Sequence, residues 1–191
     1  MKPDPDICGR AHALTVISGV APWWSLFLRL QFLVRPRLPK RWREKMAKPL
    51  EDLSFIHFAR WTLIRRLPAD PAAPPEPLRA DLLLFESNFN FDWESYIDAF
   101  SYVIPDRMKL IWQGSYGFPG PVPSTPFKEY IRANEYEAAH YYSAYPDASV
   151  TMILAALALE PKLDDLVAAS RTLDAPRFAE RFEALLSEVQ P

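Results

Sequence analysis

Polar side chains stand inside segments of the chain that otherwise look like buried strands. Glu86 and Asn88 interrupt one apolar run, and His57 and Arg60 interrupt an aromatic one. Each is costly to bury without a partner, and strand side chains alternate between faces, so Glu86 and Asn88 project side by side. A carboxylate near an imidazole or a guanidinium could act as a general base or as an anchor for a substrate. We therefore take Glu86, His57 and Arg60 as the candidate catalytic residues.

The same residues have a purely structural interpretation. Glu86 would then pair with Arg60, or cap the following helix together with its neighbours, because buried ion pairs are more often structural than catalytic. His57 and His140 would be core histidines with satisfied hydrogen bonds. The histidines lack the spacing of metal ligands, so we predict no metal site; the cofactor stays unknown, and haem is disfavoured.

Further side chains would complete a substrate pocket around this group. Tryptophans would supply an apolar wall, and a loop rich in glycine and proline, 114–126, would close the mouth. Polar contacts would come from the strand that carries Glu86 and from an aromatic segment, 140–145. The predicted substrate-binding residues are Asn88, Tyr142, Trp61, Trp112, Phe118 and His140.

The apolar periodicity of the chain predicts the elements that would position these residues. Runs rich in β-branched and aromatic residues predict strands, and an i, i+3, i+4 repeat that starts at Trp93 predicts a helix with one apolar face. The predicted strands are 12–18, 54–64, 81–89 and 140–145, and the predicted helices are 22–34, 93–104 and 125–138, with further helices after 147.

This element order, βαββαβ, is that of a ferredoxin-like fold, in which helices cover one face of an antiparallel sheet. The predicted fold class is therefore α+β. We predict one domain over 1–191, with a ferredoxin-like core at 11–146 and extra C-terminal helices at 147–191. The other face of the sheet stays open unless a second subunit or the C-terminal helices cover it, and either arrangement would enclose a pocket.

Two short segments carry a resemblance to a known group. SFIHFARW at 54–61 and LLFESNFN at 83–90, followed by a helix with Trp, Tyr and Asp, resemble bacterial proteins of the dimeric α+β barrel superfamily. That group includes dye-decolourising peroxidases, EthD-like proteins and antibiotic-biosynthesis monooxygenases. The resemblance implies a ferredoxin-like fold and a homodimer over about the first 145 residues. The Gly-x-x-Asp-Gly motif of the peroxidases is missing, so haem peroxidase activity is not expected.

Composition narrows the class of protein. The 191 residues are 49% apolar and carry a formal net charge of −2, without the broad positive charge of a nucleic-acid binder. Cys8 is the only cysteine, which rules out a disulfide within the chain and fits a reducing, cytoplasmic location. The apolar stretch 11–28 ends before it reaches the length of a membrane span. Walker, G-x-G-x-x-G, G-x-S-x-G and H-E-x-x-H motifs are missing, which disfavours the enzyme classes that use them.

A basic segment is the strongest non-catalytic signal. An apolar helix that begins with Trp23 and Trp24 runs directly into eight basic residues within 29–48, against the single acidic Glu44. This pattern is typical of contact with an anionic membrane surface. The alternative is a core helix that covers the sheet, followed by a solvated basic connection. Besides the tryptophans, the predicted membrane or partner contacts are Arg35, Arg37, Arg41 and Arg43.

Two hypotheses follow from the sequence. In the first, the protein binds a small apolar molecule or lipid on the open face of the sheet and, as an enzyme, would transform it. In the second, it is a peripheral membrane or partner-binding protein that uses 22–48 without catalysis. The sequence names neither a reaction nor a substrate, and it leaves the oligomeric state and the membrane contact undecided.

Overall fold

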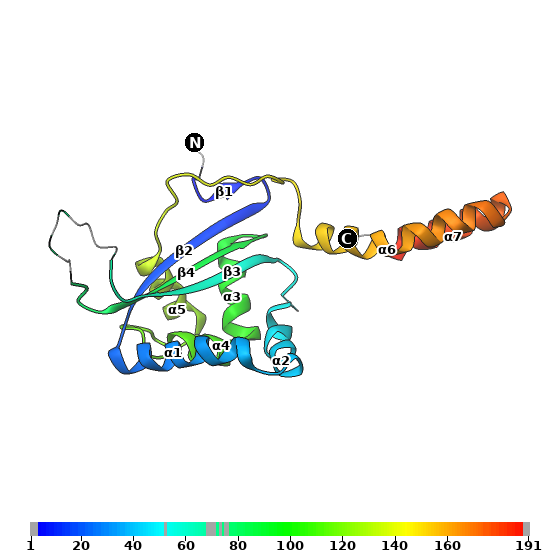
Figure 1. Ribbon diagram of the computed structural model, residues 1–191. Coiled ribbons are helices and arrows are strands. Elements are labelled where there is room, and N and C mark those ends of the chain that lie inside the picture. Colours follow the sequence, from blue (N-terminus) through cyan, green and yellow to red (C-terminus); the bar gives the residue numbers. More distant parts are fainter. Residues whose placement is uncertain (1–3, 52, 68–71, 73, 75–76, 189–191) are drawn as a thin grey trace. The chain divides into compact units, whose positions relative to one another are not determined.

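The computed structural model describes residues 4–51, 53–67, 72, 74 and 77–188. It is an α+β structure with one four-stranded antiparallel sheet, and its described part contains seven α-helices, which confirms the predicted class (Figure 1). The chain divides into two compact units, Met1–Pro146 and Asp147–Pro191. This boundary coincides with the one predicted between the core and the C-terminal helices; the count of a single domain stays a prediction.

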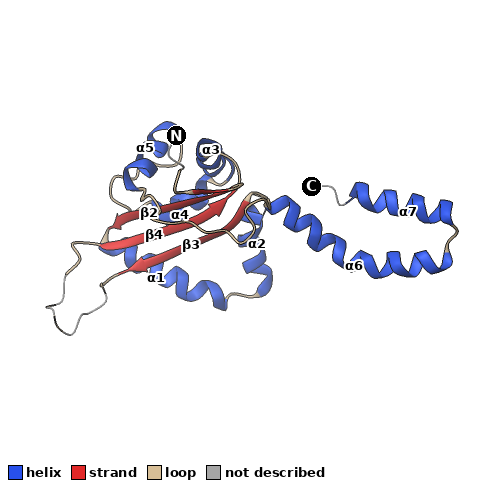
Figure 2. Cartoon of the chain, turned by 90° about the horizontal axis from the view of Figure 1, so that it is seen from above, coloured by secondary structure: helices blue, strands red, loops and turns tan. Residues whose placement is uncertain are grey.

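The sheet has the order β1-β2-β4-β3, and Figure 2 shows its three long strands side by side. The strands are β1 (Ile7–Cys8), β2 (Ala11–Val20), β3 (Ile56–Ile64) and β4 (Asp81–Phe89). Burial alternates along β2 and β4, as expected for strands with one face on a core. The register places Glu86 of β4 between Thr15 of β2 and Arg60 of β3.

Helices cover one face of this sheet. In the first unit they are α1 (Pro22–Val34), α2 (Lys40–Glu51), α3 (Trp93–Val103), α4 (Pro105–Trp112) and α5 (Ser124–Asn134), with the short 3-10 helix η1 (Arg35–Arg37) between the first two. Pro22 opens α1, and the Asp92 side chain caps α3 by accepting a hydrogen bond from the Ser95 backbone N–H. Buried residues of α1, α3, α4 and α5 form one apolar core with the inner faces of β2 and β4.

The predicted fourth strand, 140–145, is not formed, so the sheet does not follow the predicted βαββαβ order. The free edge of β2 is instead paired with β1, through Cys8 with Ala11 and Ile7 with His12. After α5 the chain reaches β2 only at one bridge, between Glu135 and Val16. β1 occupies the same edge of β2 farther along, at Ala11 and His12, and after the bridge the chain continues as coil.

The C-terminal unit is a pair of helices, α6 (Val150–Thr172) and α7 (Ala175–Glu188), drawn in Figure 2. The Ser149 side chain caps α6 by accepting a hydrogen bond from the Met152 backbone N–H. Lys162 and Glu188 form an ion pair between the two helices, and Ala169 is buried between them.

Candidate functional site

The face of the sheet opposite the helices carries two kinds of side chain in rows across the strands. The register aligns Ala13, Asn88 and Phe58 in one row. It aligns Thr15, Glu86 and Arg60 in the next. The following two rows are mainly apolar and consist of Ile17, Leu84 and Thr62, then Gly19, Leu82 and Ile64. We call the first two rows, which carry Asn88, Thr15, Glu86 and Arg60, the polar rows, and this half of the open face the polar half; the other half is mainly apolar.

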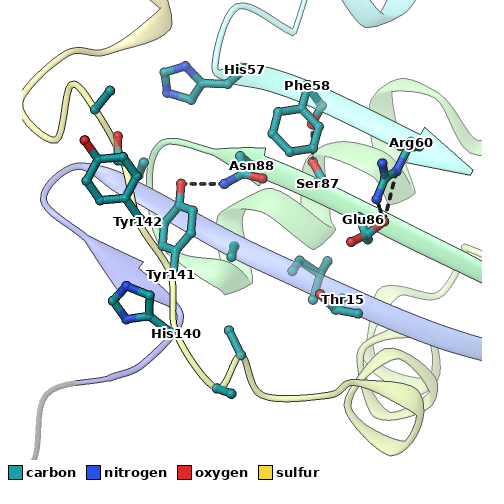
Figure 3. A pocket seen from close by; sticks show the side chains of 17 residues that line it. Thr15, His57, Phe58, Arg60, Glu86, Ser87, Asn88, His140, Tyr141 and Tyr142 are labelled. Atoms are coloured by element: carbon teal, nitrogen blue, oxygen red, sulfur yellow. Dashed lines mark hydrogen bonds and ion pairs between the residues drawn. The ribbon is translucent and has the colours of Figure 1, made fainter.

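The coil 138–144 lies over the polar half and forms a cleft with it (Figure 3). The cleft encloses about 800 Å³ and is lined by the two polar rows, by His57 and by the coil itself. Its position follows from the missing fourth strand, because a segment paired at the sheet edge would not cross the open face. The cleft lies entirely within the first unit.

Arg60 and Glu86 form an ion pair on the floor of the cleft. Nε of Arg60 donates to Oε2 of Glu86 at 2.9 Å, and the guanidinium bonds the same oxygen through Nη2 (Figure 3). The Arg60 side chain is 63% exposed and that of Glu86 29%, so the pair stabilises the fold by about 1 kcal/mol or less. Two of the three predicted catalytic residues are thus in contact, as the structural interpretation of Glu86 also predicts.

A second pair, which sequence reasoning missed, joins the floor to the coil. The amide of Asn88 donates to the hydroxyl of Tyr141, and Figure 3 shows this side chain lying over the sheet. From the sequence we predicted that His140 and Tyr142 line the pocket; on a strand these two side chains would share one face. Because the segment is coil, that alternation does not apply: all three residues line the cleft, and Tyr142 is largely exposed.

His57 occupies an irregularity in β3. The register of β3 on β4 shifts between Ile56 and Phe58, so His57 is the extra residue of a bulge and lines the cleft. The pKa of His57 is lowered, mainly because burial disfavours the charged imidazolium. A hydrogen bond with the Asn90 side chain raises this pKa and offsets part of the effect. Its Nε2 is buried and has no hydrogen-bond partner among the described residues.

Three residues predicted for the pocket lie elsewhere. Trp61 and Trp112 are on the helix-covered face, with their ring centroids 6.5 Å apart and Trp112 only 1% exposed. Trp61 faces the core because it lies one position from Arg60 on a strand. Phe118 packs against Phe127 and Tyr130 at 5.9 and 5.6 Å between ring centroids, so this part of the loop belongs to the core. None of the three lines the cleft.

The residues predicted for a membrane contact divide into two groups. Trp23, Arg41 and Arg43 are exposed, and so is Arg37, which bonds the Leu33 carbonyl. Trp24 is half-buried, and its Nε1 donates to the Ile111 carbonyl at 2.9 Å, so it fixes α1 on α4. Arg35 is also half-buried, and burial together with the nearby Arg107 lowers its pKa.

The described part of the chain contains neither a metal-binding cluster nor a membrane-spanning helix. In this part of the chain no group of three or more His, Cys, Asp or Glu side chains is placed to hold a metal ion. Within the same residues, no helix has the length and apolar character needed to cross a bilayer.

A scan against protein-family models, a search of curated proteins and a search of solved structures found no match to this chain.

Proposed function

We propose that the protein binds a small organic molecule in the cleft between the open face and the coil 138–144. The observation that carries the proposal is the combination of the polar floor and the aromatic coil over it. A ligand there would place an apolar body against Phe58 and Tyr141 and a polar group at Arg60 and Glu86. The sequence led us to expect a small apolar molecule or a lipid, and of these the polar floor favours an amphipathic ligand.

The ion pair suits anchoring better than proton transfer. Both hydrogen bonds of the pair end on Oε2 of Glu86, so Oε1 and the outer guanidinium N–H groups would be available to a ligand. Arg60 would donate to an acceptor such as a carboxylate or carbonyl, and Oε1 would accept from a neighbouring hydroxyl or amide. The proposal is therefore binding, with no reaction assigned.

We also propose that the first unit has the ferredoxin-like fold expected from the sequence and that the protein forms a homodimer. The order β2-β4-β3, with helices after β2 and β4, supports a ferredoxin-like arrangement of these three strands. The apolar rows of the open face, from Ile17 to Ile64, would be covered by a second copy. Such a dimer would also narrow the mouth of the cleft.

A titration with anilinonaphthalene sulfonate, an aromatic anion, tests the binding site. Arg60→Met should weaken binding about ten-fold or more, because a charge-assisted hydrogen bond contributes roughly 1.5–3 kcal/mol. Arg65→Met is the matched control, since Arg65 pairs with Asp81 at 3.4 Å with similar exposure but outside the cleft. Equal affinities for the two variants would refute the proposal. Native mass spectrometry of the purified chain would show a co-purified ligand directly.

A further inference from the structure

Helix α1 carries apolar side chains on both of its sides. On the inner side Leu28 is fully buried, and Phe27 and Phe32 pack against the core. On the outer side five large apolar side chains are exposed by half or more: Trp23 (64%), Leu26 (55%), Leu30 (54%), Leu33 (56%) and Val34 (50%). The role of α1 as a core helix therefore accounts for only part of its apolar residues.

These five residues form one stripe, which we call the α1 stripe. Their spacing along the helix, i, i+3, i+7, i+10 and i+11 from Trp23, keeps them on a single face about 16 Å long. The outer face of a helix in a soluble domain is normally polar, and a contiguous apolar patch of this size marks a contact site. Figure 1 shows α1 on the outer side of the helical layer, away from the sheet.

Positive charge lies next to the stripe. The segment 29–48 contains eight basic residues and one acidic residue, Glu44, so its formal net charge is +7. Because the whole chain has a net charge of −2, the remaining residues together carry a net charge of −9. Its exposed basic side chains include Arg37, Arg41 and Arg43. Trp42, on the same segment, is 52% exposed. Along the chain, the apolar stripe of α1 is therefore followed directly by the exposed basic side chains of η1 and α2, and together they form a candidate contact surface.

We propose that this surface, formed by α1, η1 and α2, docks the protein on a membrane that contains anionic lipids. The α1 stripe would enter the boundary between headgroups and acyl chains, while the arginines and lysines bind the lipid phosphates. Trp23 and Trp42 would lie at the level of the headgroups, where tryptophan is enriched. The asymmetry between +7 here and −9 elsewhere would orient the molecule as it approaches.

The positive charge and the apolar stripe of this surface together disfavour two other binding partners, a second copy of the chain and a nucleic acid. A second copy docked here would bring two segments of +7 together, which disfavours self-association. A nucleic acid would match the charge through its phosphates, but its polar backbone would leave the apolar α1 stripe without a partner. An anionic bilayer complements both the charge and the apolar stripe.

The docking surface is independent of the cleft. α1 covers the helical face of the sheet, and the cleft opens on the opposite face. A protein docked through α1 would keep the mouth of the cleft toward water. The failure of either proposal would leave the other standing, because no residue of the cleft belongs to the surface.

Vesicle sedimentation of the full chain tests the proposal, with phosphatidylcholine vesicles alone or with one third phosphatidylglycerol. We expect binding to the anionic vesicles only, weakened by salt. The triple change R37Q/R41Q/R43Q should lower the partition coefficient about a hundred-fold, from roughly 1 kcal/mol per basic residue. The same change in the C-terminal unit, R171Q/R177Q/R181Q, should leave it unchanged.

The stripe is tested separately. Leu30→Asp should lower binding about ten-fold or more, and Leu186→Asp, at a similarly exposed position of α7, should not. Brominated lipids should quench the emission of the bound protein, and W23F/W42F should remove that quenching. The remaining four tryptophans are half-buried or buried.

Three results would overturn the proposal. The first is no binding to anionic vesicles, or binding that none of the surface variants changes. The second is a change of oligomeric state in Leu30→Asp without a loss of vesicle binding, which would assign the stripe to a second copy. The third is binding of single-stranded DNA through the three arginines while vesicles stay unbound.

Discussion

The two sides of α1 should differ sharply in their contribution to stability. Leu28 and Leu30 are two residues apart on one helix, yet Leu28 is fully buried and Leu30 is 54% exposed. Leu28→Ala removes three buried carbon atoms and leaves a cavity, which should cost about 3 to 5 kcal/mol. Leu30→Ala removes a side chain already in water, so the change should stay within about 0.5 kcal/mol.

Urea unfolding followed by tryptophan emission measures this difference. All six tryptophans lie in the unit Met1–Pro146, so their emission reports on the unit that contains α1 and not on the C-terminal helices. With a slope of about 2 kcal/mol per molar urea, Leu28→Ala should lower the midpoint by roughly 2 M. Leu30→Ala should leave the midpoint almost unchanged.

Comparable losses for the two variants would refute the reasoning. They would mean that the outer side of α1 is covered in solution, either by a second copy or by another part of the chain. Repeating the titration over a range of protein concentrations separates these cases, because only a second copy makes the midpoint depend on concentration.

Three further predictions test contacts elsewhere in the unit Met1–Pro146. Gly114→Ala should destabilise the protein by about 2 to 3 kcal/mol in urea, because its Cβ would lie 2.1 Å from Cγ of Trp24. Tyr96→Phe should cost about 1 to 2 kcal/mol in the same assay, since it removes a buried 2.6 Å hydrogen bond to Ser87. Burial raises the pKa of Glu135, so the stability that this group contributes is present at low pH and is lost as the pH rises through the raised pKa. Glu135→Gln should therefore be more stable than wild type at neutral pH and lose that advantage below about pH 4, as followed by thermal unfolding. No measurable loss in the first two variants, or an advantage of Glu135→Gln that persists in acid, would contradict these contacts.

Local periodicity in the sequence was enough to find most of the elements. Helix α1 begins and ends where the apolar run from Pro22 to Val34 does, and β4 matches the predicted strand 81–89. The placement of Glu86 and Asn88 side by side follows from strand alternation alone. The pairing of Glu86 with Arg60 was one of two alternatives that the sequence left open.

The fourth strand and the cleft could not be predicted in the same way. The segment 140–145 has the composition of a strand, but a strand also needs a free edge, and the short β1 occupies part of that edge. The role of Tyr141 follows from the coil that results. Trp61 was assigned to the pocket by residue type, although strand alternation beside Arg60 places it on the core face.

The sequence by itself determined the α+β class, the bounds of α1 and β4, and a basic segment next to an apolar helix. These properties depend on residues close together in the chain, whose periodicity and charge can be read directly. Only the tertiary structure decided which side of α1 is buried, which segment pairs with the edge of β2 and which residues surround the cleft. Those outcomes depend on which of several distant segments pairs with a given strand edge or packs on a given apolar surface. A local sequence pattern does not contain that information.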